Sequence, residues 1–168
     1  GINSSFEHFY EQIKGFYRIF TASIQNCSPT TQTFSLMITV SPVATRKELK
    51  EFTKFKIKLY AGNPYAVPPL YADEREALLE GHNPALKVYD HQVFLAKRDG
   101  KTVGRIVAII NHISNRKTGK ACVRFGFIDF VEDFEVAKAL IETVEQWGRE
   151  RGMEAIHGPL GFTDFDPE

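Results

Sequence analysis

The sequence lacks the marks of several protein classes. It has two cysteines in 168 residues, Cys27 and Cys122, which are far apart and outside any C-x-x-C pattern. Neither a disulfide framework nor a zinc site is therefore indicated. No P-loop, G-x-G-x-x-G motif, Ser-His-Asp order or metal-ligand cluster is present, so we expect no metal. No run of about eighteen apolar residues occurs, which argues against a membrane span.

Charge of one sign is also lacking. Lys plus Arg and Asp plus Glu both number 21, giving a formal net charge of +0. No overall field therefore favours nucleic acid or an anionic membrane as a partner, although a local basic patch remains open. Hydrophobic residues make up 43% and charged residues 25%, as in ordinary soluble globular domains. With so few cysteines, we expect a cytoplasmic protein.

The first 36 residues look like an extension of the main domain. Apolar side chains over residues 4–25 follow the i, i+3, i+4, i+7 spacing of an amphipathic helix. They are Phe6, Phe9, Tyr10, Ile13, Phe16, Tyr17, Phe20 and Ile24. We expect this arm to pack against the domain or against another copy, which makes a homodimer through the Phe-rich helix one hypothesis. Residues 1–36 are thus predicted to be a helical arm and linker, and 37–168 the main domain.

From Met37 onward the pattern predicts an α+β (mixed α/β) domain. Thr45 is placed to cap a helix that runs to Tyr60, and Asp99-Gly100 is a hairpin turn signal. The other expected elements are strands at 37–40, 91–97, 102–111, 121–131 and 155–157, a short helix at 72–79, a polar loop at 114–120 and a helix at 134–151. Helices flanking a largely antiparallel sheet follow from this order.

Several phrases resemble a poorly characterised bacterial group of the GNAT acyl-CoA N-acyltransferase superfamily. They are KELKEF at 47–52, KLYAGNPYAVPPL at 58–70, FLAKRDGKTVGRIVAIINH at 94–112, VRFGFIDF at 123–130 and WGRERGMEAIHGPLGFTDFD at 147–166. The resemblance covers about residues 37–168. It implies a GNAT-like sheet, acetyl-CoA or another acyl-CoA as cosubstrate, and an amine acceptor that the sequence does not identify.

The chain departs from the GNAT pattern in two places. The cofactor loop of the superfamily, Q/R-x-x-G-x-G/A, corresponds here to FVEDFE at 130–135, without glycine and with three carboxylates. Asp133 is then read as a helix N-cap and Glu135 as a partner of the helix dipole, while backbone N–H groups at 134–136 remain able to bind an anion. The chain also stops at Glu168, before the C-terminal strands and helix of a GNAT domain. We therefore expect a fragment.

Three residues are candidates for proton transfer. Asp129 is the only acid within the apolar strand, and strict alternation would put it on one face with Val123, Phe125 and Phe127. It is read either as a general base or as a partner for a loop. His112 and His157, at strand ends, are read as proton relays or as structural histidines.

The remaining candidates follow from the resemblance to GNAT proteins. A splay between two strands would admit the pantetheine arm and be lined by Phe127, Ile128 and Gly158. The turn that follows would place Phe130, Val131 and Phe134 beside the cofactor. Tyr65, Pro68 and Tyr71 would form a rigid wall of the acceptor pocket, or else a structural loop.

Two functional hypotheses follow from these observations. The first is a GNAT-like N-acyltransferase that moves an acyl group from acyl-CoA to an amine. The second is a non-catalytic module for ligand binding or protein interaction that kept the fold and lost the cofactor loop.

Overall fold

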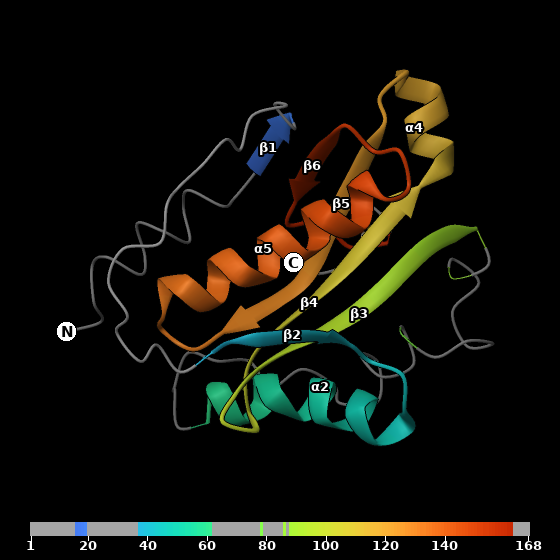
Figure 1. The fold of residues 1–168 in the computed structure, drawn as a ribbon. Coiled ribbons are helices and arrows are strands. Elements are labelled where there is room, and N and C mark those ends of the chain that lie inside the picture. Colours follow the sequence, from blue (N-terminus) through green and yellow to red (C-terminus); the bar gives the residue numbers. More distant parts are fainter. Residues whose placement is uncertain (1–15, 20–36, 62–77, 79–85, 87, 163–168) are drawn as a thin grey trace, which may run out of the picture.

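The computed structural model describes residues 16–19, 37–61, 78, 86 and 88–162 (Figure 1). Six strands form one sheet in the order β1-β6-β5-β4-β3-β2, in which only β5 and β6 are parallel neighbours. The strands are β1 (Phe16–Ile19), β2 (Thr39–Pro42), β3 (Tyr89–Arg98), β4 (Lys101–Asn111), β5 (Cys122–Phe130) and β6 (Ala155–Gly158). The helices are α2 (Arg46–Leu59), α4 (His112–Thr118) and α5 (Phe134–Arg149). The predicted α+β class, a largely antiparallel sheet flanked by helices, is confirmed.

Local signals in the sequence explain where several elements begin and turn. Thr45 and Glu48 form a reciprocal capping box at the start of α2. Asp99 and Gly100 both have positive φ, as the two central residues of a tight hairpin require. They join β3 to β4, the two longest strands of the sheet.

Two predictions of secondary structure are wrong. A helix was expected over residues 4–25, but Phe16–Ile19 form the strand β1, which pairs antiparallel with β6. The rest of that range lies outside the described residues. The loop expected at 114–120 is largely helical, because Asn111 caps α4 by accepting the Ser114 N–H at 2.9 Å. Gly119, in the left-handed conformation, ends this helix.

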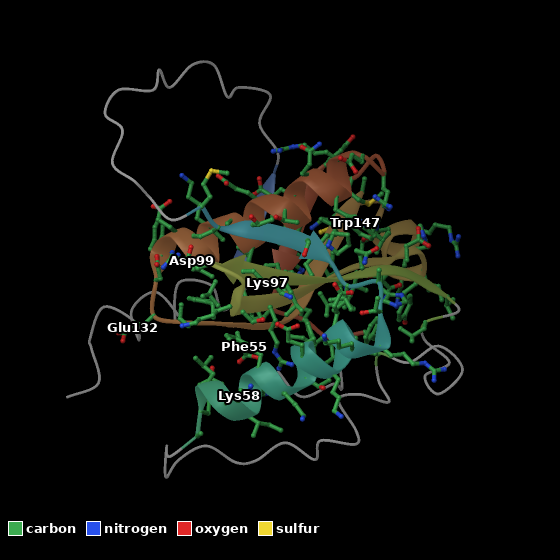
Figure 2. The ribbon with its side chains drawn as sticks, turned by 60° about the horizontal axis from the view of Figure 1, so that its bottom comes forward. Phe55, Lys58, Lys97, Asp99, Glu132 and Trp147 are labelled. Carbon is green, nitrogen blue, oxygen red and sulfur yellow. The ribbon has the colours of Figure 1, made fainter. Side chains whose placement is uncertain are left out.

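The two faces of the sheet carry separate apolar cores. On one face, α5 packs over β3, β4, β5 and β6 through Val136, Leu140 and Val144. On the other face, α2 packs against β4 through the fully buried Phe52. Figure 2 shows Phe55 between α2 and the sheet and Lys58 on the outer side of the helix. The candidate site lies on the α2 face.

Candidate functional site

A buried ion pair joins the middle two strands on the α2 face. Arg105 of β4 is fully buried, and its Nε and Nη2 lie 2.7 and 2.6 Å from Oδ2 of Asp129 on β5. The same guanidinium donates to the Phe52 carbonyl at 3.2 Å and lies 4.7 Å from the centre of the Phe52 ring. Tyr60, at the end of α2, donates its hydroxyl to Oδ1 of Asp129 at 3.0 Å. Two strands and one helix therefore meet at a single carboxylate.

A β-bulge in β5 turns Asp129 toward this face. Val107 pairs with Gly126 and Arg105 with Asp129, so Phe127 and Ile128 together stand opposite the single residue Ile106. Phe127 has a φ of 51°, in the left-handed region. Such a bulge inserts one residue and shifts the alternation of the side chains.

The face assignment made from strict alternation is therefore wrong. Val123 and Phe125 belong to the core beneath α5, whereas Phe127 packs with the core beneath α2. Asp129 lies with Phe127 on the α2 face, because Arg105 and Tyr60 reach it there. The extra residue of the bulge separates the two halves of the strand.

Only the first part of β5 pairs with β6, and the strand continues beyond that part. The β5–β6 ladder covers Cys122–Arg124, while the ladder between β5 and β4 runs on to Phe130 (Figure 1). After β6, the chain bends and the Leu160 N–H donates to the Phe125 carbonyl at 2.7 Å. Gly158 lies so close to the Phe125 ring that a Cβ there would be 2.6 Å from it. Gly158 thus ends β6 against Phe125, whereas Phe127 and Ile128 lie further along β5, where the Phe127 ring is 6.0 Å from the ring of the buried Phe162.

The N-terminus of α5 is occupied by its own carboxylate. Asp133 caps the helix by accepting the Glu135 N–H at 2.9 Å, and it forms a 2.7 Å ion pair with Arg98. The hydrogen bond from Arg98, followed by backbone N–H groups, lowers the pKa of the Asp133 carboxyl. The interpretation of Asp133 as an N-cap is confirmed. Because Glu132 and Glu135 are exposed beside it, this turn does not fit a pyrophosphate.

The other residues expected at this turn have separate environments. The Val131 N–H donates to the Val103 carbonyl at 2.9 Å, so the ladder already uses it. The Phe130 side chain is buried in the core beneath α5, whereas Phe134 is 62% exposed at the start of that helix. None of the three side chains forms a cradle for phosphate.

The three residues predicted for proton transfer do not form one cluster. His112 follows the C-terminal end of β4, about 23 Å from Arg105 at the usual rise per residue, and its Nε2 donates a hydrogen bond to Oδ2 of Asp90 at 3.0 Å. His157 pairs in register with Arg124, about 15 Å along β5 from Asp129. Asp129 is the candidate that the described fold surrounds with polar partners.

Acid is expected to destabilise the fold through His157. Burial, and then the charges of Arg124 and Lys120, hold the pKa of His157 below its usual 6.5. The unfolded chain therefore binds the proton more readily, and the stability of the fold decreases as pH falls below about 6.5, where the unfolded imidazole becomes protonated. Urea unfolding between pH 7 and pH 5 should show a steeper loss of stability in the parent than in His157→Gln. His112→Gln is the control for removing one imidazole, and equal slopes in the parent and His157→Gln would contradict the prediction.

Sequence reasoning missed Arg105 and Tyr60 as site residues. Arg105 directly precedes the apolar run Ile106–Ile110, and a charged residue adjoining a buried strand is a signal that it has a buried partner. Tyr60 ends a helix whose boundary was predicted, but nothing local shows that it reaches β5. The acceptor wall at Tyr65, Pro68 and Tyr71 lies outside the described residues.

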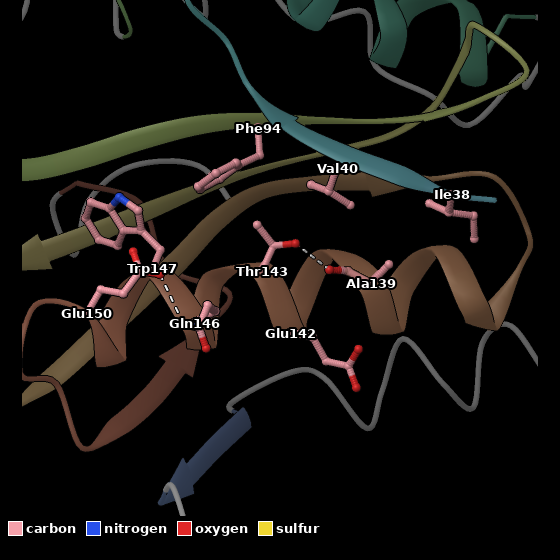
Figure 3. A pocket seen from close by; sticks show the side chains of 9 residues that line it. All are labelled: Ile38, Val40, Phe94, Ala139, Glu142, Thr143, Gln146, Trp147 and Glu150. Atoms are coloured by element: carbon pink, nitrogen blue, oxygen red, sulfur yellow. Dashed lines mark hydrogen bonds between the residues drawn. The ribbon is translucent and has the colours of Figure 1, made fainter. Parts of the chain in front are cut away.

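A groove of about 460 Å³ lies on the opposite face of the sheet, between β2 and α5 (Figure 3). Its lining comprises Ile38, Val40, Phe94, Ala139, Glu142, Thr143, Gln146, Trp147 and Glu150. Neither Asp129 nor Tyr60 contributes to it. We therefore do not assign the groove to the chemistry at Asp129.

Two further features are absent from the part of the chain that the structure describes. Within these residues, no group of three or more His, Cys, Asp or Glu side chains is placed to hold a metal ion. None of the helices described here is both long and apolar enough to cross a membrane.

Comparison with known proteins identifies relatives by sequence. No family model matches the sequence. Protein YghO of Escherichia coli K12 is 35% identical over 117 residues, which are 70% of this chain and 30% of that protein. A bacterial ceramide synthase of Caulobacter vibrioides is 35% identical over 127 residues, 75% of this chain and 33% of that protein. The chain thus spans about a third of the length of these relatives.

A solved structure agrees with the resemblance found in the sequence. A tandem GNAT protein from the clavulanic acid biosynthesis pathway matches with a TM-score of 0.53 and 15% identity, over 70% of this chain and 34% of that chain. The order of strands and helices described above accounts for the match. The chain therefore has the fold of the GNAT acetyltransferases.

Proposed function

We propose that this chain is part of an acyl-CoA-dependent N-acyltransferase whose reaction takes place beside the bulge of β5. The observation that carries the proposal is the position of the Tyr60–Asp129 pair, next to the strand segment that extends past the β6 ladder. A thioester lying along that segment would have its carbonyl within reach of the strand backbone near Ile128. The GNAT fold supports acyl-CoA as the class of donor.

The reaction joins an amine nitrogen to the acyl carbon and breaks the carbon–sulfur bond, so that the donor leaves as a thiolate, which takes a proton from water while Asp129 returns the amine's proton to the solvent. The attacking amine must also lose a proton. In the proposed arrangement, Tyr60 Oη takes this proton as its own proton passes to Oδ1 of Asp129 along the existing 3.0 Å hydrogen bond. Arg105 positions the carboxylate through Oδ2. His112 and His157 have no part in this route.

For the acceptor, we propose an amine carried on a lipid. The support is the 35% identity to a protein named bacterial ceramide synthase, over three quarters of this chain. A ceramide is an amino lipid acylated on nitrogen, so the chemistry matches N-acyl transfer. The phosphates of the donor would be held outside the α5 turn, because Asp133 already occupies the Glu135 N–H.

Replacing Tyr60 by phenylalanine is expected to lower kcat about 100-fold or more in the natural full-length protein, since the group that accepts the amine proton is lost. The assay measures thiol release from acyl-CoA with a long-chain amino alcohol as acceptor. Tyr89→Phe, which removes a hydroxyl from β3, is the matched control.

Calorimetric titration with acyl-CoA separates binding from chemistry in the same proteins. We expect micromolar binding in the parent and in Tyr60→Phe. Transfer by Tyr60→Phe at the parental rate would refute the proposed relay. Absence of acyl-CoA binding in the parent would refute the enzyme and leave the non-catalytic module.

A further inference from the structure

The outer face of α2 carries basic side chains along its whole length. Six of its residues are exposed, and five of these are cationic. They are Arg46, Lys47, Lys50, Lys54 and Lys58, and the sixth is Ile57, which is 41% exposed. At 3.6 residues per turn, these six positions fall within an arc of about 120° and extend about 18 Å along the axis. We call this surface the α2 basic face.

The carboxylates of α2 do not neutralise this face. Glu48 accepts hydrogen bonds from the Ala44 and Thr45 N–H groups at 3.1 and 3.0 Å, as part of the capping box. Glu51 is drawn toward the sheet, where it forms a 3.2 Å ion pair with Lys97 and accepts the Thr102 hydroxyl. Hydrogen bonding, from Ala44 to Glu48 and from Thr102 to Glu51, lowers the pKa of both carboxyl groups. Both acids are thus committed elsewhere, so among the described residues of α2 the charges left on this face are the exposed cations.

The α2 basic face adjoins the candidate site. Lys58 is two residues before Tyr60, whose hydroxyl contacts Asp129. Figure 2 shows Lys58 directed away from the sheet while Phe55 lies on the inner side of the helix. A surface that meets the lysines would therefore lie next to the end of α2 from which Tyr60 reaches the site.

We propose that the α2 basic face docks the protein onto an anionic lipid membrane. Clusters of about four to eight Lys or Arg side chains on one helix are typical of segments that bind anionic lipid headgroups. The net charge of the chain is +0, so the attraction is local to this face. The choice of a lipid surface over an acidic protein rests on the proposed function, because an acceptor carried on a lipid is met at a membrane.

The test is binding of the 168-residue chain to vesicles of phosphatidylcholine with 30% phosphatidylglycerol, measured by co-sedimentation without any acyl donor. Each basic residue near such a surface strengthens binding about fivefold, from about 1 kcal/mol converted at 25 °C. Lys50→Gln, Lys54→Gln and Lys58→Gln combined should therefore weaken binding about 100-fold. Raising the salt to 0.5 M shortens the Debye length about threefold relative to dilute buffer. Binding of the parent chain should therefore weaken as well.

Arg116→Gln, Lys117→Gln and Lys120→Gln combined are the matched control. They remove three cations around α4, at the other side of the molecule from α2, and change the net charge equally (Figure 1). We expect this control to bind within about threefold of the parent. Equal losses in both triple variants, or no binding of the parent to the anionic vesicles, would overturn the proposal. Because no acyl transfer is measured, failure here is distinct from failure of the proposed enzyme.

Discussion

Replacing Arg105 by methionine is expected to lower the free energy of unfolding by about 3–5 kcal/mol. The change removes the guanidinium that lies 2.7 Å from Asp129 and leaves that carboxylate buried, 8% exposed, without its cationic partner. The donation to the Phe52 carbonyl and the contact with the Phe52 ring are lost as well. Urea denaturation followed by circular dichroism measures the effect as a lower midpoint.

The double variant Arg105→Met with Asp129→Leu identifies the cause. Replacing both members of a buried ion pair by apolar groups is often close to neutral, whereas removing one member is costly. We therefore expect the double variant to recover most of the lost stability. A double variant as unstable as Arg105→Met would show that lost packing, and not the uncompensated carboxylate, sets the cost.

This pair connects stability with the proposed chemistry. Because Arg105 contacts Oδ2 of Asp129, the other oxygen is left to accept from Tyr60. A change at Arg105 should thus disturb the site even where the chain still folds. A low-dielectric setting also strengthens the hydrogen bond to Tyr60, which makes the position of the phenol well defined.

The predicted elements depended on signals that are local in the chain. Thr45 and Glu48 lie three residues apart, and Asp99 and Gly100 are adjacent, so the cap and the hairpin were both readable from sequence. The same holds for Asp133, which caps α5 through the Glu135 N–H. Such contacts involve neighbouring residues and are fixed by short-range geometry.

Apart from the helix α4, whose cap at Asn111 is local, the errors arose where distant residues decide the structure. Residues 16–19 have helical spacing, yet pairing with β6, about 140 residues away, makes them a strand. The bulge at Phe127 is set by the register between β4 and β5, and no repeat in the sequence marks it. Asp129 was singled out correctly as a buried acid, but its partners Tyr60 and Arg105 come from elements 69 and 24 residues away.

The non-catalytic alternative is tested most directly by the turn before α5. In place of the glycines of the GNAT loop, this turn has Asp133 as the N-cap of α5, and an ion pair with Arg98 holds the Asp133 carboxylate. This turn therefore has a complete structural role of its own. The site at Asp129 does not depend on the turn, so a changed mode of holding the donor's phosphates is compatible with an active enzyme.

Replacing Gly126 by alanine is expected to cost about 3 kcal/mol and to weaken acyl-CoA binding. A Cβ at this position would lie 2.4 Å from the Leu160 carbonyl oxygen, which is backbone and has no flexible end to move. Relieving the contact would disturb the 2.7 Å bond between the Leu160 N–H and the Phe125 carbonyl. Overpacking of about 1–3 kcal/mol and a lost hydrogen bond of about 1 kcal/mol together give this magnitude.

We expect Gly126→Ala to weaken acyl-CoA binding because Leu160 follows the bend at which the chain leaves β6. If the bend shifts, the strand backbone beside Ile128 is displaced, and the proposed position of the thioester is lost. Gly119→Ala is the control, since its Cβ would meet nothing within 4 Å and its cost of about 1–2 kcal/mol comes only from a φ of 66°. Unfolding midpoints and acyl-CoA titrations of both variants should show a binding loss for Gly126→Ala alone. Parental binding by a folded Gly126→Ala would place the donor away from this bend.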